Sequence, residues 1–169
     1  EFRRVLFRSK IEYLHYVGAE TDGRKIVLPE NIKSMHMMFS GTDLERGVII
    51  PDGVTDTSYL YADCKHLTEG SVVPDSVTNQ NGQYDGCDNL TDAKNFSKNV
   101  KTIDGYAANC GLLEKVDYIP DSAVSAVNAL QGCESITEVR GGRGLQSAQG
   151  IYAGMLSLTV PSPEMNPEA

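Results

Sequence analysis

The stretch SVVPDSVTNQNGQYDGCDNLTDA, residues 71–93, decides the fold, because the chain repeats its pattern at a fixed interval. The preceding module, VIIPDGVTDTSYLYADCKHLTEG at 48–70, has its proline, cysteine and leucine in the same places. Three kinds of residue keep this 23-residue step along the chain: Cys64, Cys87, Cys110 and Cys133; Leu67, Leu90, Leu113 and Ile136; Pro51, Pro74 and Pro120, with Ser97 in the missing proline position. A tandem repeat of this length predicts a stacked solenoid.

Each module is expected to form one turn of the solenoid. A short β-prone run (VII, SVV or DYI) stands before the proline and predicts a strand of about three residues, which ends there because proline has no N–H to donate. Stacking places equivalent residues one strand spacing apart, so the cysteine and leucine positions form columns in one continuous core. We therefore expect a solenoid of short parallel β-strands joined by loops or single helical turns.

The repeat extends over about six turns between residues 26 and 160. The first copy, 26–47, is one residue short, and alignment on Leu44 puts Gly41 in the cysteine position. The last copy ends in YAGMLSLT at 152–159, with Met155 in that position. Irregular copies at both ends are typical of repeats that cap a stack.

The IPDSV-like block followed by G-C-x-x-L-T, as in VVPDSVTNQNGQYDGCDNLT at 72–91, resembles the bacterial leucine-rich repeats of the BspA type. The resemblance covers residues 26 to about 160 and is specific for the repeat, not for an activity. It implies a surface or secreted protein of a bacterium, a parasite or a bacterial virus, used in adhesion and recognition. An extracellular, cell-surface or virion location follows as an expectation.

The segments outside the repeat have different patterns. Residues 1–9, EFRRVLFRS, resemble the translation of a sequencing-library adapter and are expected to be non-native. Residues 10–25 contain the alternating run IEYLHYV, which predicts a cap strand, and then a Thr-Asp-Gly turn signal. Residues 161–169, PSPEMNPEA, predict a disordered tail or a truncated linker, so we expect flanking domains of a longer chain.

The net charge and the length of the apolar runs indicate which kinds of partner the chain can have. The 169 residues carry a net charge of −8, which argues against nucleic acid or an anionic membrane as the main partner. No run approaches the ~20 apolar residues of a membrane span, so membrane insertion is not expected. The expected partner is a protein or a cell-surface ligand.

The four cysteines allow three interpretations. Zinc needs ligands that converge on one point, whereas residues on successive turns lie in a row. Disulfides between neighbouring turns would have suitable Cα separations but parallel Cβ vectors. The favoured interpretation is a column of buried, reduced thiols that act as small apolar side chains. On that basis, a serine at one of these positions should be less stable than an alanine, because its hydroxyl would be poorly satisfied.

A candidate binding face follows from the exposed positions of the expected strands. Its residues are Arg46, Glu69, Ser71, Asp92, Lys94, Lys115, Asp117 and Glu138. Their charges are mixed and aromatic residues are absent, whereas the tyrosines gather before the cysteines. This pattern does not identify a ligand.

The sequence shows no catalytic constellation. His15, His36 and His66 fall at different phases of the repeat, and Lys98 interrupts the acidic column that follows the prolines. We therefore expect no enzyme, no cofactor and no metal. The favoured function is a non-enzymatic recognition module of a larger bacterial or bacteriophage surface protein. The alternatives are a structural spacer and a glycan-binding accessory domain of an enzyme.

Overall fold

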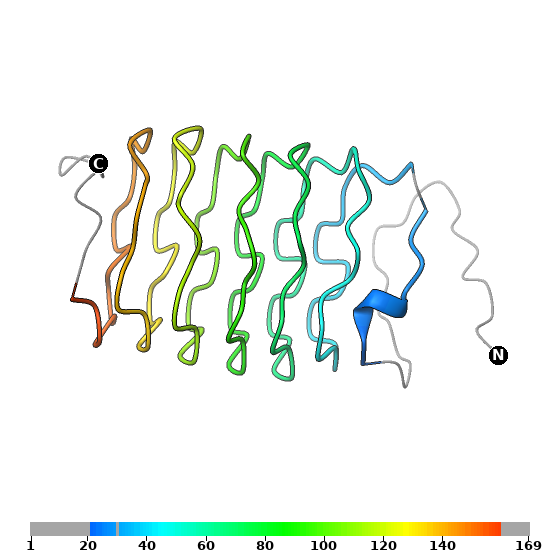
Figure 1. The fold of residues 1–169 in the computed structure, drawn as a ribbon, viewed down its shortest axis with the longest axis horizontal. Coiled ribbons are helices and arrows are strands. Elements are labelled where there is room, and N and C mark those ends of the chain that lie inside the picture. The colour runs from blue at the N-terminus through cyan, green and yellow to red at the C-terminus, as the bar shows by residue number, and fades with distance from the viewer. Residues whose placement is uncertain (1–20, 30, 160–169) are drawn as a thin grey trace.

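The computed structural model describes residues 21–29 and 31–159, which form a stack of similar coils (Figure 1). The coils follow one another along the rod in chain order, so each contacts its neighbours in sequence. The predicted solenoid is confirmed. Residues 1–9, the part of the expected cap strand at 10–20, and the tail at 161–169 lie outside the described residues.

The described residues contain one short helix, the 3-10 helix η1 at Gly23–Lys25. Asp22 caps it, because its carboxylate accepts a hydrogen bond from the backbone N–H of Arg24. Asp22 also forms a parallel bridge with Arg46 of the next coil. The described end of the expected cap strand is therefore one bridging residue followed by a helical turn.

Two columns of parallel β-bridges connect the coils. The first pairs Asp22, Arg46, Glu69 and Asp92 in succession, and the second pairs Ser34, Asp56, Asn79, Thr102, Ser125 and Ser147. A further bridge joins Ile119 and Gly141. The expected three-residue strands are thus replaced, in the described residues, by bridges at single positions.

The first bridge column lies two residues before the expected strands, and buried tyrosines explain why the ladder stops there. The N–H of Gly47 still donates to the carbonyl of Glu69 at 2.8 Å. The next N–H, of Val48, donates instead to the hydroxyl of Tyr61 at 2.8 Å. Ser71 N–H donates to Tyr84 in the same way at 3.0 Å. Because these N–H groups donate to tyrosine hydroxyls in the core, they are not available to extend the backbone ladder between coils.

The segment before each cysteine is a tight turn with alternating hydrogen bonds. Tyr59 N–H donates to Asn81 of the next coil at 2.7 Å, whereas Leu60 N–H donates within its own coil to Thr57 at 3.1 Å. Left-handed residues recur at two points four residues apart in each coil. The first set is Met37, Tyr59, Gly82, Gly105, Asn128 and Gly150, and the second is Gly41, Asp63, Gly86, Asn109, Gly132 and Gly154.

The second left-handed set corrects one sequence assignment. Gly41 is equivalent to Asp63 and precedes the cysteine position, which Thr42 occupies. Thr42 Oγ1 lies 3.5 Å from Cys64 Sγ and donates to the carbonyl of Phe39 at 2.8 Å. The missing residue of the first coil therefore falls between Thr42 and Leu44, and alignment on Leu44 shifted the position by one.

The core consists of columns of equivalent side chains. Cys64, Cys87, Cys110, Cys133, Leu67, Leu90, Leu113 and Ile136 are all fully buried. The four thiols are free. Each donates to a backbone carbonyl of the preceding coil at 2.9–3.0 Å; the acceptors are Phe39, Tyr61, Tyr84 and Ala107. Pro51, Pro74 and Pro120 are half-buried at the corner where the coil turns.

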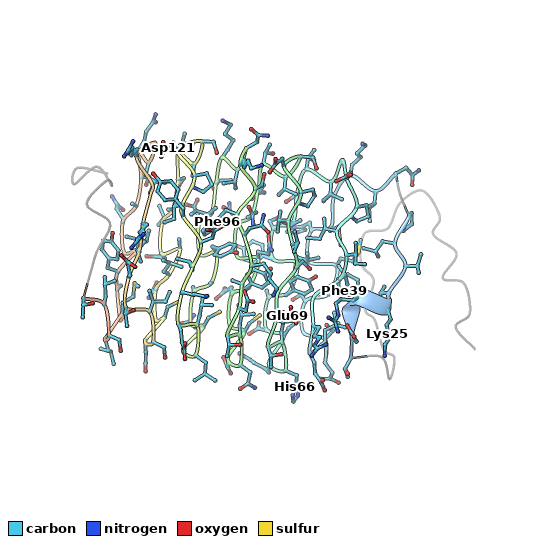
Figure 2. All side chains as sticks on the ribbon, viewed as in Figure 1. Lys25, Phe39, His66, Glu69, Phe96 and Asp121 are labelled. Atoms are coloured by element: carbon cyan, nitrogen blue, oxygen red, sulfur yellow. The ribbon has the colours of Figure 1, made fainter. Side chains whose placement is uncertain are left out.

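Aromatic rings fill the N-terminal half of the core. Phe39 stacks on Tyr61 at a centroid distance of 6.2 Å, and Tyr61 stacks on Tyr84 at 5.6 Å. Tyr106 meets Tyr84 edge-on at 5.4 Å and packs against Phe96 at 4.5 Å. Figure 2 shows Phe39 and Phe96 inside the stack, with His66 and Asp121 at opposite edges.

Candidate functional site

The first bridge column brings several of the predicted face residues together. Arg46, Glu69 and Asp92 follow one another along the column, one per coil. Their side chains point to the surface, because successive residues of an extended chain face opposite sides and the residues that follow them are buried: Gly47, Gly70 and Ala93. A charged row therefore follows the N-terminal half of the solenoid.

Lys94 joins the row from a tight turn. Its Nζ contacts Glu69 Oε1 at 2.6 Å and Asp92 Oδ2 at 2.7 Å, so one ammonium bridges two coils. Its backbone is left-handed, with a φ of 63°, and its N–H donates to Asp92 Oδ1 at 2.9 Å. A non-glycine residue in this conformation costs about 1–2 kcal/mol. The turn directs the Lys94 side chain back over Glu69.

The same row ends at η1. Arg24 forms a bidentate pair with Asp22, with its Nε 2.9 Å from Oδ1 and its Nη2 2.9 Å from Oδ2. Arg46 lies between this pair and the Lys94 cluster, and its Nε is 3.6 Å from Glu69 Oε2. Three cations and three carboxylates thus alternate across four coils.

These contacts keep the carboxylates ionised. The hydrogen bond from Lys94 is the main cause that lowers the pKa of Glu69, and it does the same for Asp92. The hydrogen bond from Arg24 lowers the pKa of Asp22 to about 2. The pKa of Lys94 is raised by the same partners. Every member of the row whose pKa shifts therefore keeps its charge at neutral pH.

A shallow pocket of about 160 Å³ opens beside the row. It is lined by Arg24, Arg46, Gly47, Val48, Ile49, Glu69, Gly70, Ser71, Val72 and Lys94. Ile49 is 66% exposed and Val72 is 69% exposed, so the pocket has an apolar rim next to its charged wall. Figure 2 shows Glu69 among the side chains of this part of the stack.

Sequence reasoning missed the apolar column that forms this rim. Val27, Ile49, Val72 and Tyr118 occupy equivalent positions and are exposed, and Asn95 takes the fifth place. The signal was present, because alternation along VII and SVV turns the middle residue outward between two buried neighbours. Exposed aliphatic side chains in adjacent coils are typical of a contact surface.

Four predicted face residues differ from the expectation: Ser71 lines the pocket but is buried, and Lys115, Asp117 and Glu138 lie outside the pocket. Ser71 was expected to be exposed but is buried; its hydroxyl donates to the carbonyl of Val48 at 2.6 Å and lies 2.5 Å from Tyr61 Oη. Lys115 is exposed but forms no bridge, so the first column does not continue from Asp92 to it. Asp117 is exposed two coils from Glu69, and Glu138 pairs with Arg140 at 2.8 Å.

The described residues were also compared with the requirements of a metal site, a membrane span and a reactive thiol. Across residues 21–29 and 31–159, no group of three His, Cys, Asp or Glu side chains is arranged to hold a metal ion. The same part of the chain has no helix of the length and apolar character that crossing a bilayer requires. Burial raises the pKa of each of the four thiols.

Comparisons with known proteins support the fold. No protein-family model matches the chain, and no curated protein matches it. A leucine-rich repeat protein of T. pallidum superposes with a TM-score of 0.70 at 23% identity, over 81% of this chain and 68% of that one. A leucine-rich repeat protein from Bacteroides ovatus gives 0.55 at 24% identity, over 80% of this chain and 47% of that one. The chain therefore has the predicted leucine-rich-repeat-like fold.

Proposed function

We propose that this chain is a non-enzymatic recognition module that binds a protein ligand at the pocket beside the first bridge column. One observation carries the proposal. Ile49 and Val72 are largely exposed, next to the charged side chains of Arg46 and Glu69, on coils whose backbones are tied together by bridges. Exposed apolar side chains bordered by charged ones, on a rigid support, are typical of a protein-binding surface.

The biological context is part of the same proposal. The resemblance of the repeat to the BspA type favours an adhesion-type module at a bacterial cell surface or in a bacteriophage virion. The chain spans 68% of one similar solved structure and 47% of the other, which is compatible with a repeat unit that belongs to a larger protein. Its net charge of −8 favours a protein partner over nucleic acid.

The two alternatives fit the surface less well. A pure spacer needs no exposed aliphatic side chains, and a mixed charged surface would serve it better than Ile49 and Val72 do. A glycan-binding groove is usually lined by aromatic rings, but Tyr61, Tyr84 and Tyr106 are buried. Tyr59 is 41% exposed but lies in the turn segment, where its ring meets His36 edge-on at 6.0 Å. Tyr118 is 42% exposed but lies two coils from Val72, with Asn95 between them, and does not line the pocket.

A displayed library of protein fragments tests the proposal. Binders are selected on the wild-type chain and then measured on the double variant Ile49→Ser, Val72→Ser. The matched control is Val124→Ser, because Val124 is 40% exposed and lies outside the pocket. We expect most binders to lose at least tenfold in affinity on the double variant and to keep it on the control. Binders that tolerate the double variant, or an absence of binders, would contradict a recognition role for this pocket.

A further inference from the structure

We propose that Arg46 binds a side-chain carboxylate of an extended partner segment, and that an aliphatic residue next to this carboxylate lies on Ile49 and Val72. This inference rests on the proposed recognition function and specifies the chemistry of the ligand. It names Arg46 as the polar anchor of the pocket and the two aliphatic side chains as its apolar contact.

Arg46 is the cation of the pocket with bonding capacity left over. Arg24 is engaged by both carboxylate oxygens of Asp22, and Lys94 is held by Glu69 and Asp92 at 2.6 and 2.7 Å. Within residues 21–29 and 31–159, Arg46 makes one ion pair, at 3.6 Å, which is longer than a hydrogen bond. A guanidinium presents five N–H donors in a planar fork that fits a carboxylate with two parallel hydrogen bonds.

Glu69 cannot act as a competing site for a cationic ligand. Its Oε1 is occupied by Lys94, and its Oε2 faces Arg46. The hydrogen bond from Lys94 also keeps Glu69 ionised. Among the residues that line the pocket, three are cations and one is a carboxylate. Arg24 and Lys94 are already paired with carboxylates at short distance, so an anion that enters meets Arg46 as the weakly paired cation, although the whole chain is acidic.

The positions of the aliphatic residues define the direction of the ligand. Ile49 follows Arg46 by three residues in one coil, and Val72 follows Glu69 by three residues in the next. Equivalent positions in adjacent coils are about 4.8 Å apart, so the two side chains form a continuous apolar strip. Val27 extends this strip into the preceding coil. The strip extends to the coil before Arg46 and to the coil after it. A ligand that covers the strip therefore continues on both sides of its carboxylate, which fits the side chain of an internal residue better than a terminal carboxylate.

Three N-acetylated peptides, two of them also amidated, test the assignment by NMR titration. The first probe is acetyl-Leu-Glu-Leu-amide, the second is its Gln analogue, and the third is acetyl-Leu-Gln-Leu with a free terminal carboxylate. The signals followed are the methyl groups of Ile49 and Val72 and the Nε–H of Arg46. We expect the Glu peptide to shift all three and to bind about tenfold more tightly than the Gln amide, as one charge-assisted hydrogen bond pair predicts.

Variants of Arg46 separate its role from general binding. Arg46→Gln should abolish the preference for Glu over Gln, and Arg46→Lys should keep only part of it because an ammonium lacks the planar fork. The matched control is Arg140→Gln, which removes an exposed arginine that pairs with Glu138 four repeats from Arg46 along the solenoid. The control should keep the full preference. Thermal melting of each variant checks that it is folded.

The outcomes distinguish this inference from the proposed function. Equal affinity for the Glu and Gln peptides, with shifts at Ile49 and Val72, would overturn the role of Arg46 and leave the recognition pocket intact. Tighter binding of the free-acid peptide than of the Glu peptide would replace the side-chain carboxylate with a terminal one. If no peptide shifted these signals up to its solubility limit, the carboxylate assignment would be wrong. Only failure of the fragment-library experiment would refute the recognition function itself.

Discussion

The backbone N–H of Ser97 donates a hydrogen bond to Oε1 of Gln80 at 2.9 Å, and both residues are fully buried. Four other coils have a proline at the position of Ser97, and proline has no N–H. Where the proline is absent, a buried donor appears and needs an acceptor. Gln80 supplies it from a position where neighbouring coils have Thr57 and Ile103.

Gln80→Leu is therefore expected to lower the free energy of unfolding by about 1–3 kcal/mol, because Ser97 N–H would remain buried without a partner. Adding Ser97→Pro removes that N–H, so the double variant should recover part of the loss. Urea unfolding of the four members of the double-mutant cycle measures the coupling. Additive effects, within about 0.5 kcal/mol, would show that the hydrogen bond does not link these residues.

The buried tyrosine hydroxyls differ in whether a buried backbone N–H donates to them. Tyr61 Oη accepts from Val48 N–H at 2.8 Å, so Tyr61→Phe leaves a buried backbone donor without a partner. We expect a loss of about 1–3 kcal/mol in the free energy of unfolding. The Tyr106 hydroxyl donates one long hydrogen bond, at 3.4 Å, to the carbonyl of Ala93, so Tyr106→Phe should cost less than about 1 kcal/mol. Equal losses of unfolding free energy in the two variants, measured by chemical denaturation, would contradict the explanation that the tyrosine hydroxyl ends the backbone ladder by binding Val48 N–H.

The period of the sequence was sufficient to predict the stack, because cysteine, leucine and proline repeat together and fix the register of the central coils. The first coil was misaligned by one residue, since its deletion lies between Thr42 and Leu44 and leaves both flanking motifs intact. Only the backbone conformation reveals this, through the left-handed residue Gly41.

The candidate site was predicted in part. Arg46, Glu69, Asp92 and Lys94 do come together, because equivalent positions align along the stack. Burial of Ser71 could not be foreseen, since it depends on the Tyr61 hydroxyl that reaches it across the core. The turn at Lys94 follows from a positive φ that a single sequence does not encode.

Alkaline pH should destabilise the chain. Burial raises the pKa of all four thiols in the folded state, for Cys133 to about 12, and it also raises those of Tyr61, Tyr84 and Tyr106. In the unfolded chain these groups lose protons near pH 8.5 and 10. Their contribution to stability is therefore complete below about pH 8.5 and decreases above it.

The expected decrease is about 1.4 kcal/mol per pH unit for each thiol that ionises only on unfolding. Urea unfolding at pH values between 7 and 10 measures this decrease. In Cys87→Ala, the free energy of unfolding should fall less steeply with pH, because one fewer thiol contributes. A stability that stays constant up to pH 10 would contradict burial of the thiols.

The cysteine column is expected to tolerate serine better than its polarity suggests. Each thiol already donates to a carbonyl of the preceding coil, and Thr42 shows that a hydroxyl fits the same position and finds a carbonyl acceptor, in its case within its own coil. Cys87→Ser should therefore be no less stable than Cys87→Ala, each losing about 1–2 kcal/mol. This prediction reverses the order expected from sequence, because the structure provides a carbonyl acceptor for the group at this position. Unfolding free energies of the two variants decide between the orders.

Thiol labelling tests the same column in the native protein. All four cysteines are fully buried, and burial raises their pKa values, so labelling should be slow without denaturant and complete with it. Rapid labelling of the native protein would show that the column is accessible. Failure to label the denatured, unreduced protein would show that the thiols are oxidised.

The left-handed position of the turn offers a stabilising change. Met37 and Tyr59 occupy it with φ near 53°, whereas Gly82, Gly105 and Gly150 occupy it in later coils. The ring of Tyr59 covers Gly82, where an added Cβ would lie 2.4 Å from Tyr59 Cε1, so Tyr59 gains packing in return for its strain. Met37 is 38% exposed and is the better residue to replace.

Met37→Gly should raise the free energy of unfolding by about 0.5–1 kcal/mol. Relief of the left-handed strain contributes about 1–2 kcal/mol, and the greater freedom of glycine in the unfolded chain offsets about 0.5–1 kcal/mol of it. The matched control is Leu112→Gly, at a residue that is 50% exposed and is not among those with positive φ. There the same change relieves no strain and should lower stability by about 0.5–1 kcal/mol. Opposite signs in urea unfolding support the strain at Met37, and equal losses in both variants would exclude it.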